Sequence, residues 1–326
     1  MYASDYQGIT QVNPPQIVGD DFVQQSDCQL RPLQRNNRLL AEMLEKADPS
    51  LVAGLSRFFK TGPGQYGEGD KFLGIKVPVT RKVVKACWRH VGLSDLEECI
   101  CSEYHEVRLA ALLTLVQIFS HAKRLPVKPG VPFFTGAKDP DSSLRPAIPE
   151  GSPTRSPLAA DAACEPGISQ ADCVDFYLAH TAYINNWDLV DLSCYPLLGV
   201  WLLDKDRSLL YDLARDGKTL WEQRIGIVST MTFIRHGQLD DTFAIADILL
   251  HHPHDLIHKA VGWLLREAGK RDKATLEAWL QGIPSQAREY DSVMPGRDRA
   301  SLMPRTMLRY AIEKFPEAER RFYLQR

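Results

Sequence analysis

Residues 106–118 read EVRLAALLTLVQI, and this stretch decides the fold class. Its aliphatic residues recur at the spacing of a helix that buries a broad apolar face. Residues 256–265, LIHKAVGWLL, repeat the pattern. No stretch of the chain shows the strict alternation of apolar and polar residues that is typical of a half-buried strand. The sequence therefore predicts an all-α protein.

Several of the predicted helices share a spine in which a basic residue is followed by small or aliphatic residues. The basic residues are Arg108, Arg224, Lys259 and Arg305. Lys259 follows Arg224 by 35 residues, and Asp188 precedes Arg224 by 36. A helix pair of this length cannot bury its apolar face alone, so such pairs stack. We expect an α-α superhelix, a HEAT-like solenoid in which the second helix of each pair lines the concave side.

The recurring basic residues have two interpretations that the sequence alone leaves open. They can form a cationic track along the concave side, for which the phosphates of duplex DNA are the natural ligand. Alternatively, they can make ion pairs that connect one repeat to the next. The formal net charge of −2 supports neither interpretation, because a DNA-binding protein needs a basic face and not a basic total.

Two segments lack helical periodicity. Residues 1–36 are rich in Gln, Asp and Pro, and residues 123–170 contain nine of the 21 prolines. Neither segment has enough apolar residues to form a core, so we expect both to be disordered. The interval from Arg108 to Asp188 shrinks to 32 residues, close to one repeat, when 123–170 is removed. We therefore expect one repeat domain over 37–326 that is interrupted by a Pro-rich insertion.

The remaining composition excludes several classes of protein. With 44% hydrophobic and 25% charged residues, the chain is an ordinary globular one, and no apolar run reaches the length of a membrane span. Its first residues lack the order of a secretory signal or a transit peptide. We expect an intracellular protein, located in the cytoplasm, or in the nucleus if the source is a eukaryote. The seven cysteines show no zinc-binding spacing, and no metal or other cofactor is expected.

The segment 187–204, which we expect to form one helix, departs from the basic spine. It places Asp188 where its neighbours have Arg or Lys, and Asp191 lies one turn further along the same face. Stacking at 35 residues would bring Asp191, Arg224 and Trp263 from three consecutive helices toward one cleft. A structural interpretation is also open, since aspartate in a first turn is favoured by the helix dipole and tryptophan is usually a core residue.

Four sequence blocks carry a resemblance to a known family. They are residues 66–78 (YGEGDKFLGIKVP), 185–193 (NNWDLVDLS), 220–226 (LWEQRIG) and 258–267 (HKAVGWLLRE). In this order and at this spacing they resemble the AlkD-like DNA alkylation repair proteins, over roughly 37–122 and 171–325. The resemblance implies a C-shaped solenoid whose concave face binds duplex DNA with alkylated bases. The insertion at 123–170 is not part of the family's pattern.

The resemblance also implies functional residues, position by position. The family's catalytic aspartate matches Asp191, its two cleft tryptophans match Trp187 and Trp263, and its cleft arginine, which would hold a phosphate, matches Arg224. Arg266 is a further DNA-contact candidate from the same blocks. The spine adds Arg108, Lys259 and Arg305, and the segment after the Gly-rich turn adds Lys76 and Arg81 as phosphate contacts.

This residue set suits hydrolysis of the N-glycosidic bond of a cationic N3- or N7-alkylated purine. The base leaves as a neutral molecule, and positive charge develops on the sugar, where a carboxylate stabilises it. The resemblance implies that the enzyme works without a base-specific pocket and that neutral lesions react poorly. We expect a monomeric glycosylase. A non-catalytic duplex-binding protein and a HEAT-type protein-interaction scaffold are the alternatives.

Overall fold

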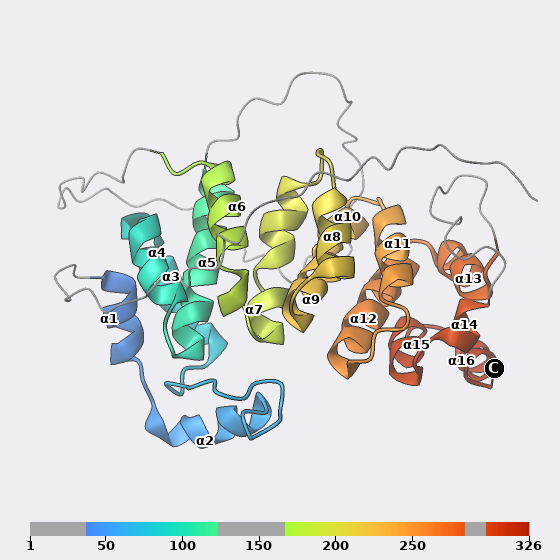
Figure 1. Ribbon diagram of the computed structural model, residues 1–326, viewed down its shortest axis with the longest axis horizontal. Helices are drawn as coiled ribbons and strands as arrows, with labels where there is room; N and C mark the ends of the chain where they lie inside the picture. The colour runs from blue at the N-terminus through green and yellow to red at the C-terminus, as the bar shows by residue number, and fades with distance from the viewer. Residues whose placement is uncertain (1–36, 123–166, 284–297, 326) are drawn as a thin grey trace, which may run out of the picture. The chain divides into compact units, whose positions relative to one another are not determined.

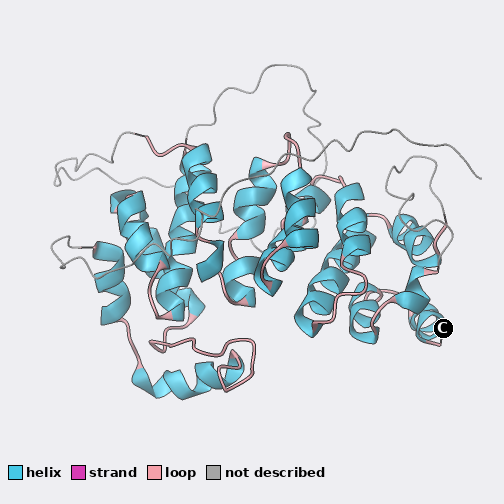
Figure 2. Cartoon of the chain, in the orientation of Figure 1, coloured by secondary structure: helices cyan, strands magenta, loops and turns pink. Residues whose placement is uncertain are grey.

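The computed structural model describes residues 37–122, 167–283 and 298–325. Regular structure in these ranges is helical apart from one isolated bridge between Lys71 and Tyr104 (Figure 2). The predicted all-α class is confirmed. The segment 1–36 and most of the insertion 123–170 lie outside the described residues. Within the described ranges, no helix combines the length and apolar character that crossing a bilayer requires.

The helices are labelled in Figure 1. The α-helices are α1 Arg38–Glu45, α2 Pro49–Phe58, α3 Val77–Cys87, α4 Leu93–Ile100, α5 His105–His121, α6 Gln170–Ala179, α7 Trp187–Asp191, α8 Ser208–Asp216, α9 Leu220–Val228, α10 Met231–Arg235, α11 Asp240–Ile248, α12 Asp255–Arg271, α13 Lys273–Gln281, α14 Arg299–Leu302, α15 Arg305–Ala311 and α16 Glu317–Leu324. The described ranges also contain two 3₁₀-helices (η1 Trp88–His90 and η3 Thr181–Tyr183) and a π-helix (η4 Tyr195–Gly199).

The spine helices stack in the order that the repeat predicted. Helix α5 packs against α7, α7 against α9, α9 against α12 and α12 against α15. Each also packs against a partner nearby in the sequence, such as α4 for α5 and α8 for α9 (Figure 1). The small residues of the spine allow this close packing: a Cβ atom at Gly262 in α12 would lie 2.5 Å from the carbonyl oxygen of Met307 in α15.

The predicted continuous helix 187–204 is wrong. Helix α7 ends at Asp191, and the chain re-forms as the π-helix η4. Pro196 has no N–H to donate and its ring displaces the preceding turn, so the regular hydrogen-bond pattern cannot continue. In η4, the carbonyl oxygen of Tyr195 accepts a hydrogen bond of 2.6 Å from the Thr232 hydroxyl of α10. Trp187 and Asp191 therefore stand on a helix of only five residues.

Helix α2 lies across the direction of the other helices in Figure 1 and buries none of its side chains completely. Its N-terminus is anchored where the Asp48 amide donates to the carbonyl oxygen of Leu73 at 2.9 Å. Gly74 has a φ of +86°, and a Cβ atom there would lie 1.9 Å from the Asp48 carbonyl oxygen. Glu106 fixes the same turn, because its carboxylate accepts hydrogen bonds of 2.9–3.0 Å from the amides of Leu73, Gly74 and Ile75.

We predict that Gly74→Ala lowers the free energy of unfolding by about 2–4 kcal/mol, since an alanine meets both an unfavourable φ and a backbone clash. Gly54→Ala in α2 is the matched control. Nothing lies within 4 Å of a Cβ atom at Gly54, and alanine favours helix there. Urea denaturation of both variants tests the prediction. Equal stability of the two would show that the Gly74 turn does not need glycine.

Candidate active site

Helix α7 is held at its first residue by the two asparagines that precede it. The Asn186 side chain caps α7, since it accepts a hydrogen bond of 2.9 Å from the Trp187 amide. The amides of Asn185 and Asn186 donate to the two carboxylate oxygens of Asp70 at 3.1 and 3.2 Å. Asp70 belongs to the Gly-rich turn before α3, so this turn positions the start of α7.

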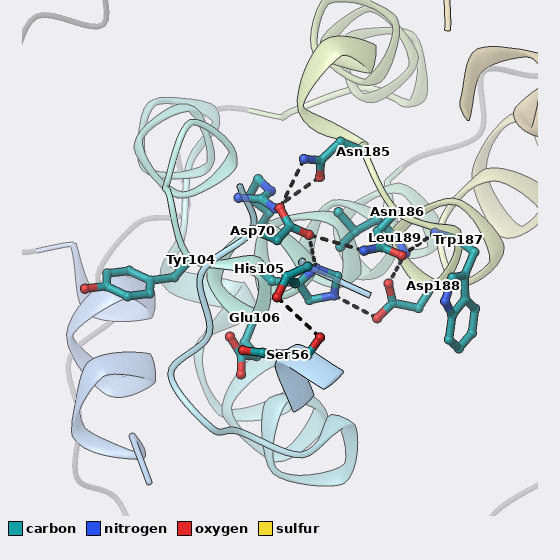
Figure 3. A network of polar contacts seen from close by, with 12 residues as sticks. Ser56, Asp70, Tyr104, His105, Glu106, Asn185, Asn186, Trp187, Asp188 and Leu189 are labelled. Atoms are coloured by element: carbon teal, nitrogen blue, oxygen red, sulfur yellow. Dashed lines mark hydrogen bonds and ion pairs between the residues drawn. The ribbon is translucent and has the colours of Figure 1, made fainter. Parts of the chain in front are cut away.

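A buried network of charged side chains lies behind Trp187 (Figure 3). His105, the first residue of α5, places Nδ1 3.1 Å from Asp70 and Nε2 2.9 Å from Asp188. Arg108 donates to the other oxygen of Asp70 at 2.5 Å and to Asn185 at 3.1 Å. Because an ionised carboxylate only accepts hydrogen bonds, both ring nitrogens of His105 donate and the imidazole is protonated.

The charges of this network raise the pKa of His105 and lower the pKa of Asp70. Burial alone would lower the pKa of His105, but hydrogen bonds to Asp188 and Asp70 raise it to about 9. Burial alone would raise the pKa of Asp70, but the hydrogen bond from His105 and the charge of Arg108 lower it to about 2. His105 and Asp70 are therefore both charged at neutral pH, and the network connects α5, the Gly-rich turn and α7.

Asp191 forms a bidentate ion pair with Arg224, the spine residue of α9. Arg224 Nε lies 2.8 Å from Oδ1 of Asp191, and Nη2 lies 2.8 Å from Oδ2. The third donor, Nη1, reaches the carbonyl oxygen of Leu256 in α12 at 2.5 Å. Burial raises the pKa of the Asp191 carboxyl, and the adjacent Arg224 guanidinium opposes that rise. Arg224, which belongs to the next repeat, therefore fixes the orientation of the Asp191 carboxylate.

A pocket of about 380 Å³ opens beside Asp191 and Trp187, between α2, α5 and α7. Aromatic rings form much of its wall: Phe59 stacks on Trp187 with 5.6 Å between ring centroids and on Phe72 with 5.2 Å. The lining residues are Leu55, Phe58, Phe59, Phe72, Ile75, Lys76, Val77, Pro78, His105, Glu106, Leu109, Trp187, Asp188, Asp191 and Leu192. Asp191 is among the lining residues, and its side chain keeps 15% of its surface exposed.

The structure assigns two of the predicted DNA contacts to the interior. Arg108 is 4% exposed and its guanidinium pairs with Asp70, so it is not available to a phosphate. The Arg224 side chain is 6% exposed and directed at Asp191, which differs from the phosphate contact we expected. Both side chains connect neighbouring helices of the stack. For these two positions the ion-pair interpretation of the basic spine holds.

The other predicted residues lie outside the pocket or at its edge. Trp263 is half-buried in α12 against the core and does not line the pocket. Lys259 pairs with Asp255 at 2.8 Å, and Arg266 pairs with Glu267 and Glu313. The exposed Arg305 donates to the carbonyl oxygen of Leu324 at 2.5 Å. Lys76 and Arg81 are exposed at the start of α3, and Lys76 also lines the pocket.

Sequence analysis missed three residues of this region, namely Asp70, His105 and Glu106. Asp70 lies in the Gly-rich block 66–78, and His105 and Glu106 lie three and two residues before the spine residue Arg108. A signal was present, since a polar pair at the start of a strongly apolar helix needs partners when it is buried. The partners of His105 and Glu106 lie in the turn before α3, and no repeating pattern in the sequence specifies the path of that turn.

The network makes stability depend on pH. A histidine whose pKa is raised from 6.5 to about 9 stabilises the fold fully below pH 6.5, and this contribution is lost as pH rises through 9. The Asp70 contribution, with its pKa lowered from 3.8 to about 2, is present above pH 3.8 and is lost below it. We predict that the free energy of unfolding falls by about 2–3 kcal/mol between pH 6.5 and 9.

Urea denaturation across this pH range measures the effect. His105→Gln should be less stable throughout and should lose the decrease, because the titrating group is gone. The matched control is His251→Gln at an exposed position in the turn before α12, which should keep it. A wild-type protein whose stability is flat from pH 6.5 to 9 would show that His105 is not charged in the fold.

Comparison with known proteins places this site within a family. The profile of the family described as "DNA alkylation repair enzyme" matches residues 39–127 and 157–315. A solved structure described as a "Predicted DNA alkylation repair enzyme from Enterococcus faecalis" superposes with a TM-score of 0.52 at 13% identity. The superposition covers 83% of this chain and 97% of the other, and at this identity it shows a shared fold alone. No curated protein matches in sequence. The profile covers most of the chain, which therefore belongs to the DNA alkylation repair enzyme family.

Proposed function

We propose that this protein is a DNA glycosylase that hydrolyses the N-glycosidic bond of cationic N3- or N7-alkylated purines in duplex DNA. The observation that carries the proposal is the placement of Asp191. Its carboxylate is held rigidly by Arg224, lines the pocket, and shares it with the indole of Trp187. Membership of the family supports a DNA repair role. The glycosylase chemistry is our inference from these residues.

The chemistry needs a fixed negative charge next to the sugar. When the bond to an alkylated purine breaks, the base leaves neutral and the sugar becomes oxocarbenium-like. A carboxylate at about 4 Å in a medium of effective dielectric near 20 stabilises a unit positive charge by roughly 4 kcal/mol. The ion pair with Arg224 reduces this figure, but it prevents the carboxylate from turning away as the charge develops. The indole face of Trp187 adds about 0.5–2 kcal/mol of cation–π attraction.

Duplex DNA would be held by basic side chains that are free to reach phosphates. Within the described residues, Lys76 and Arg81 have no ion-pair partner, both are exposed at the start of α3, and Lys76 lines the pocket. Lys259, Arg266 and Arg305 already have protein partners, so we rank them below Lys76 and Arg81 as candidate phosphate contacts. We propose that the protein acts as a monomer on intracellular DNA and that Trp263 contacts the duplex beside α9.

We predict that Asp191→Asn slows release of 7-methylguanine or 3-methyladenine from alkylated duplex DNA by about 100-fold or more, since the stabilising charge is lost while the shape is kept. Single-turnover release of the free base measures it. Asp204→Asn, at an exposed position, should release base at the wild-type rate. A wild type no faster than spontaneous depurination would favour the non-catalytic duplex-binding alternative.

For the DNA surface, we predict that Lys76→Gln with Arg81→Gln weakens duplex binding and reduces the slope of log affinity against log salt by about two. The control replaces two lysines that already have acidic partners, Lys46 and Lys314, with glutamine. Both double variants lose the same formal charge, so the comparison isolates position. Equal salt slopes for the two would place the DNA elsewhere, and affinity that ignores salt would argue against DNA altogether.

A further inference from the structure

We propose that one face of α3, continued by η1, binds the phosphates of the duplex on one side of the lesion only. This face, which we call the α3 surface, consists of Lys76, Arg81, Lys82, Lys85 and Arg89. The proposal rests on the glycosylase function proposed above, which puts the damaged nucleotide at Asp191, and it assigns the direction in which the DNA leaves that site.

The α3 surface carries positive charge that the protein does not neutralise. Residues 76–90, KVPVTRKVVKACWRH, contain five Lys and Arg and no Asp or Glu, although the whole chain has a net charge of −2. All five are exposed residues, and none of them forms an ion pair within the ranges that the structure describes. A segment of this kind attracts a polyanion, and duplex DNA carries the required row of phosphates.

The helices packed against α3 do not supply the missing negative charge. In α1 the charges of Arg38 and Glu42 cancel, and Glu45 pairs with Lys46. In α5 the carboxylate of Glu106 is buried and accepts hydrogen bonds from three backbone amides. Glu106 lines the same pocket as Lys76, so it offsets at most that one cation of the five.

The cations lie next to one another along α3. Lys85 follows Arg81 by four residues and Lys82 by three, and residues at these spacings are neighbours on a helix surface. Like charges so placed repel one another and destabilise the helix, and bound phosphates would remove this repulsion. Arg89 continues the row in η1, where its guanidinium lies 4.4 Å from the centroid of the Trp88 ring.

The row of cations starts at the pocket beside Asp191. Pro78 lines this pocket and precedes Arg81 and Lys82 by three and four residues, so both cations share its face of α3. From Lys76 to Arg89 the α3 surface extends about 20 Å, at about 1.5 Å per residue. At about 3.4 Å of helix axis per base pair, this length matches about six base pairs that lead away from the lesion.

The other side of the site offers fewer free cations. In the stack, α3 and α12 lie on opposite sides of α7 (Figure 1). Three of the four Lys and Arg side chains of α12 have acidic partners, namely Lys259 with Asp255, Arg266 with Glu313 and Lys270 with Glu267. We therefore expect the protein to need duplex on the α3 side of the lesion and little on the α12 side.

The charge of the α3 surface is tested without a lesion, by fluorescence anisotropy with undamaged duplex. We expect the triple variant Lys82→Gln, Lys85→Gln, Arg89→Gln to bind about tenfold more weakly at about 0.1 M salt. Its slope of log affinity against log salt should fall by about two to three. Because these substitutions relieve repulsion, the variant should unfold at the wild-type urea concentration or above it.

The matched control replaces Lys205, Lys273 and Lys314 with glutamine. These lysines have acidic partners, and the control loses the same formal charge. Equal affinities and salt slopes for the two triple variants would overturn the proposal. Wild-type protein that binds vesicles of anionic lipid in preference to duplex DNA would overturn it as well.

The one-sided contact is tested with two duplexes of equal length that carry one 7-methylguanine. The lesion lies about two base pairs from the 5′ end in one duplex and from the 3′ end in the other. At limiting enzyme, we expect the wild type to release the base about tenfold faster from one of them, and the α3 triple variant to lose this difference. Equal rates for the wild type would overturn the one-sided contact and leave the glycosylase standing.

If neither duplex is excised, the glycosylase function fails, and the affinities for the same two duplexes decide the further proposal. Unequal affinities that the α3 triple variant makes equal would support the α3 surface on its own. Equal wild-type affinities would overturn it.

Discussion

A protonated imidazole between two carboxylates, shielded from water, is the interaction on which the candidate site depends. A helix of five residues such as α7 has no stability of its own, so its orientation must come from its contacts. His105 connects Asp188 of α7 to Asp70 of the Gly-rich turn, and Arg108 completes the charges. Burying four charges is costly and adds little net stability. What the network provides is a single arrangement of α7, and with it the directions of Trp187 and Asp191.

The parts of this structure that follow a period could be predicted from the sequence. Helix class and stacking order come from apolar spacing, and the meeting of Asp191 with Arg224 follows from a 33-residue separation on successive helices of a 35-residue repeat. The contact of His105 with Asp70 could not be predicted, because Asp70 lies in an irregular turn between Gly69 and Gly74, both at positive φ, and no pattern specifies its path. Pro196 was visible, but a proline can end, kink or bulge a helix, and the local sequence does not specify which of these occurs.

The basic residues illustrate how one sequence signal can carry two meanings. Arg108 and Arg224 share the spine position with Lys259 and Arg305, yet the first two are buried between helices and the last two reach the surface. A guanidinium can donate in several directions at once, which suits it to connecting three segments, as Arg224 does with α7 and α12. Lys76 and Arg81, at the start of α3, are exposed instead, which is why we propose them as phosphate contacts.

The anchoring of Asp48 on Leu73 has a consequence for how this enzyme family can vary. The two ends of the segment 48–73 meet through one backbone hydrogen bond of 2.9 Å, and the missing side chain of Gly74 makes room for their contact. A chain excursion whose ends coincide can be exchanged for another of different length or composition while the stacked helices remain in place. Leu55, Phe58 and Phe59 belong to this excursion, but so does Asp70, which holds the start of α7. A substitute segment can therefore reshape one wall of the cavity and leave α7 in place only if it retains that carboxylate.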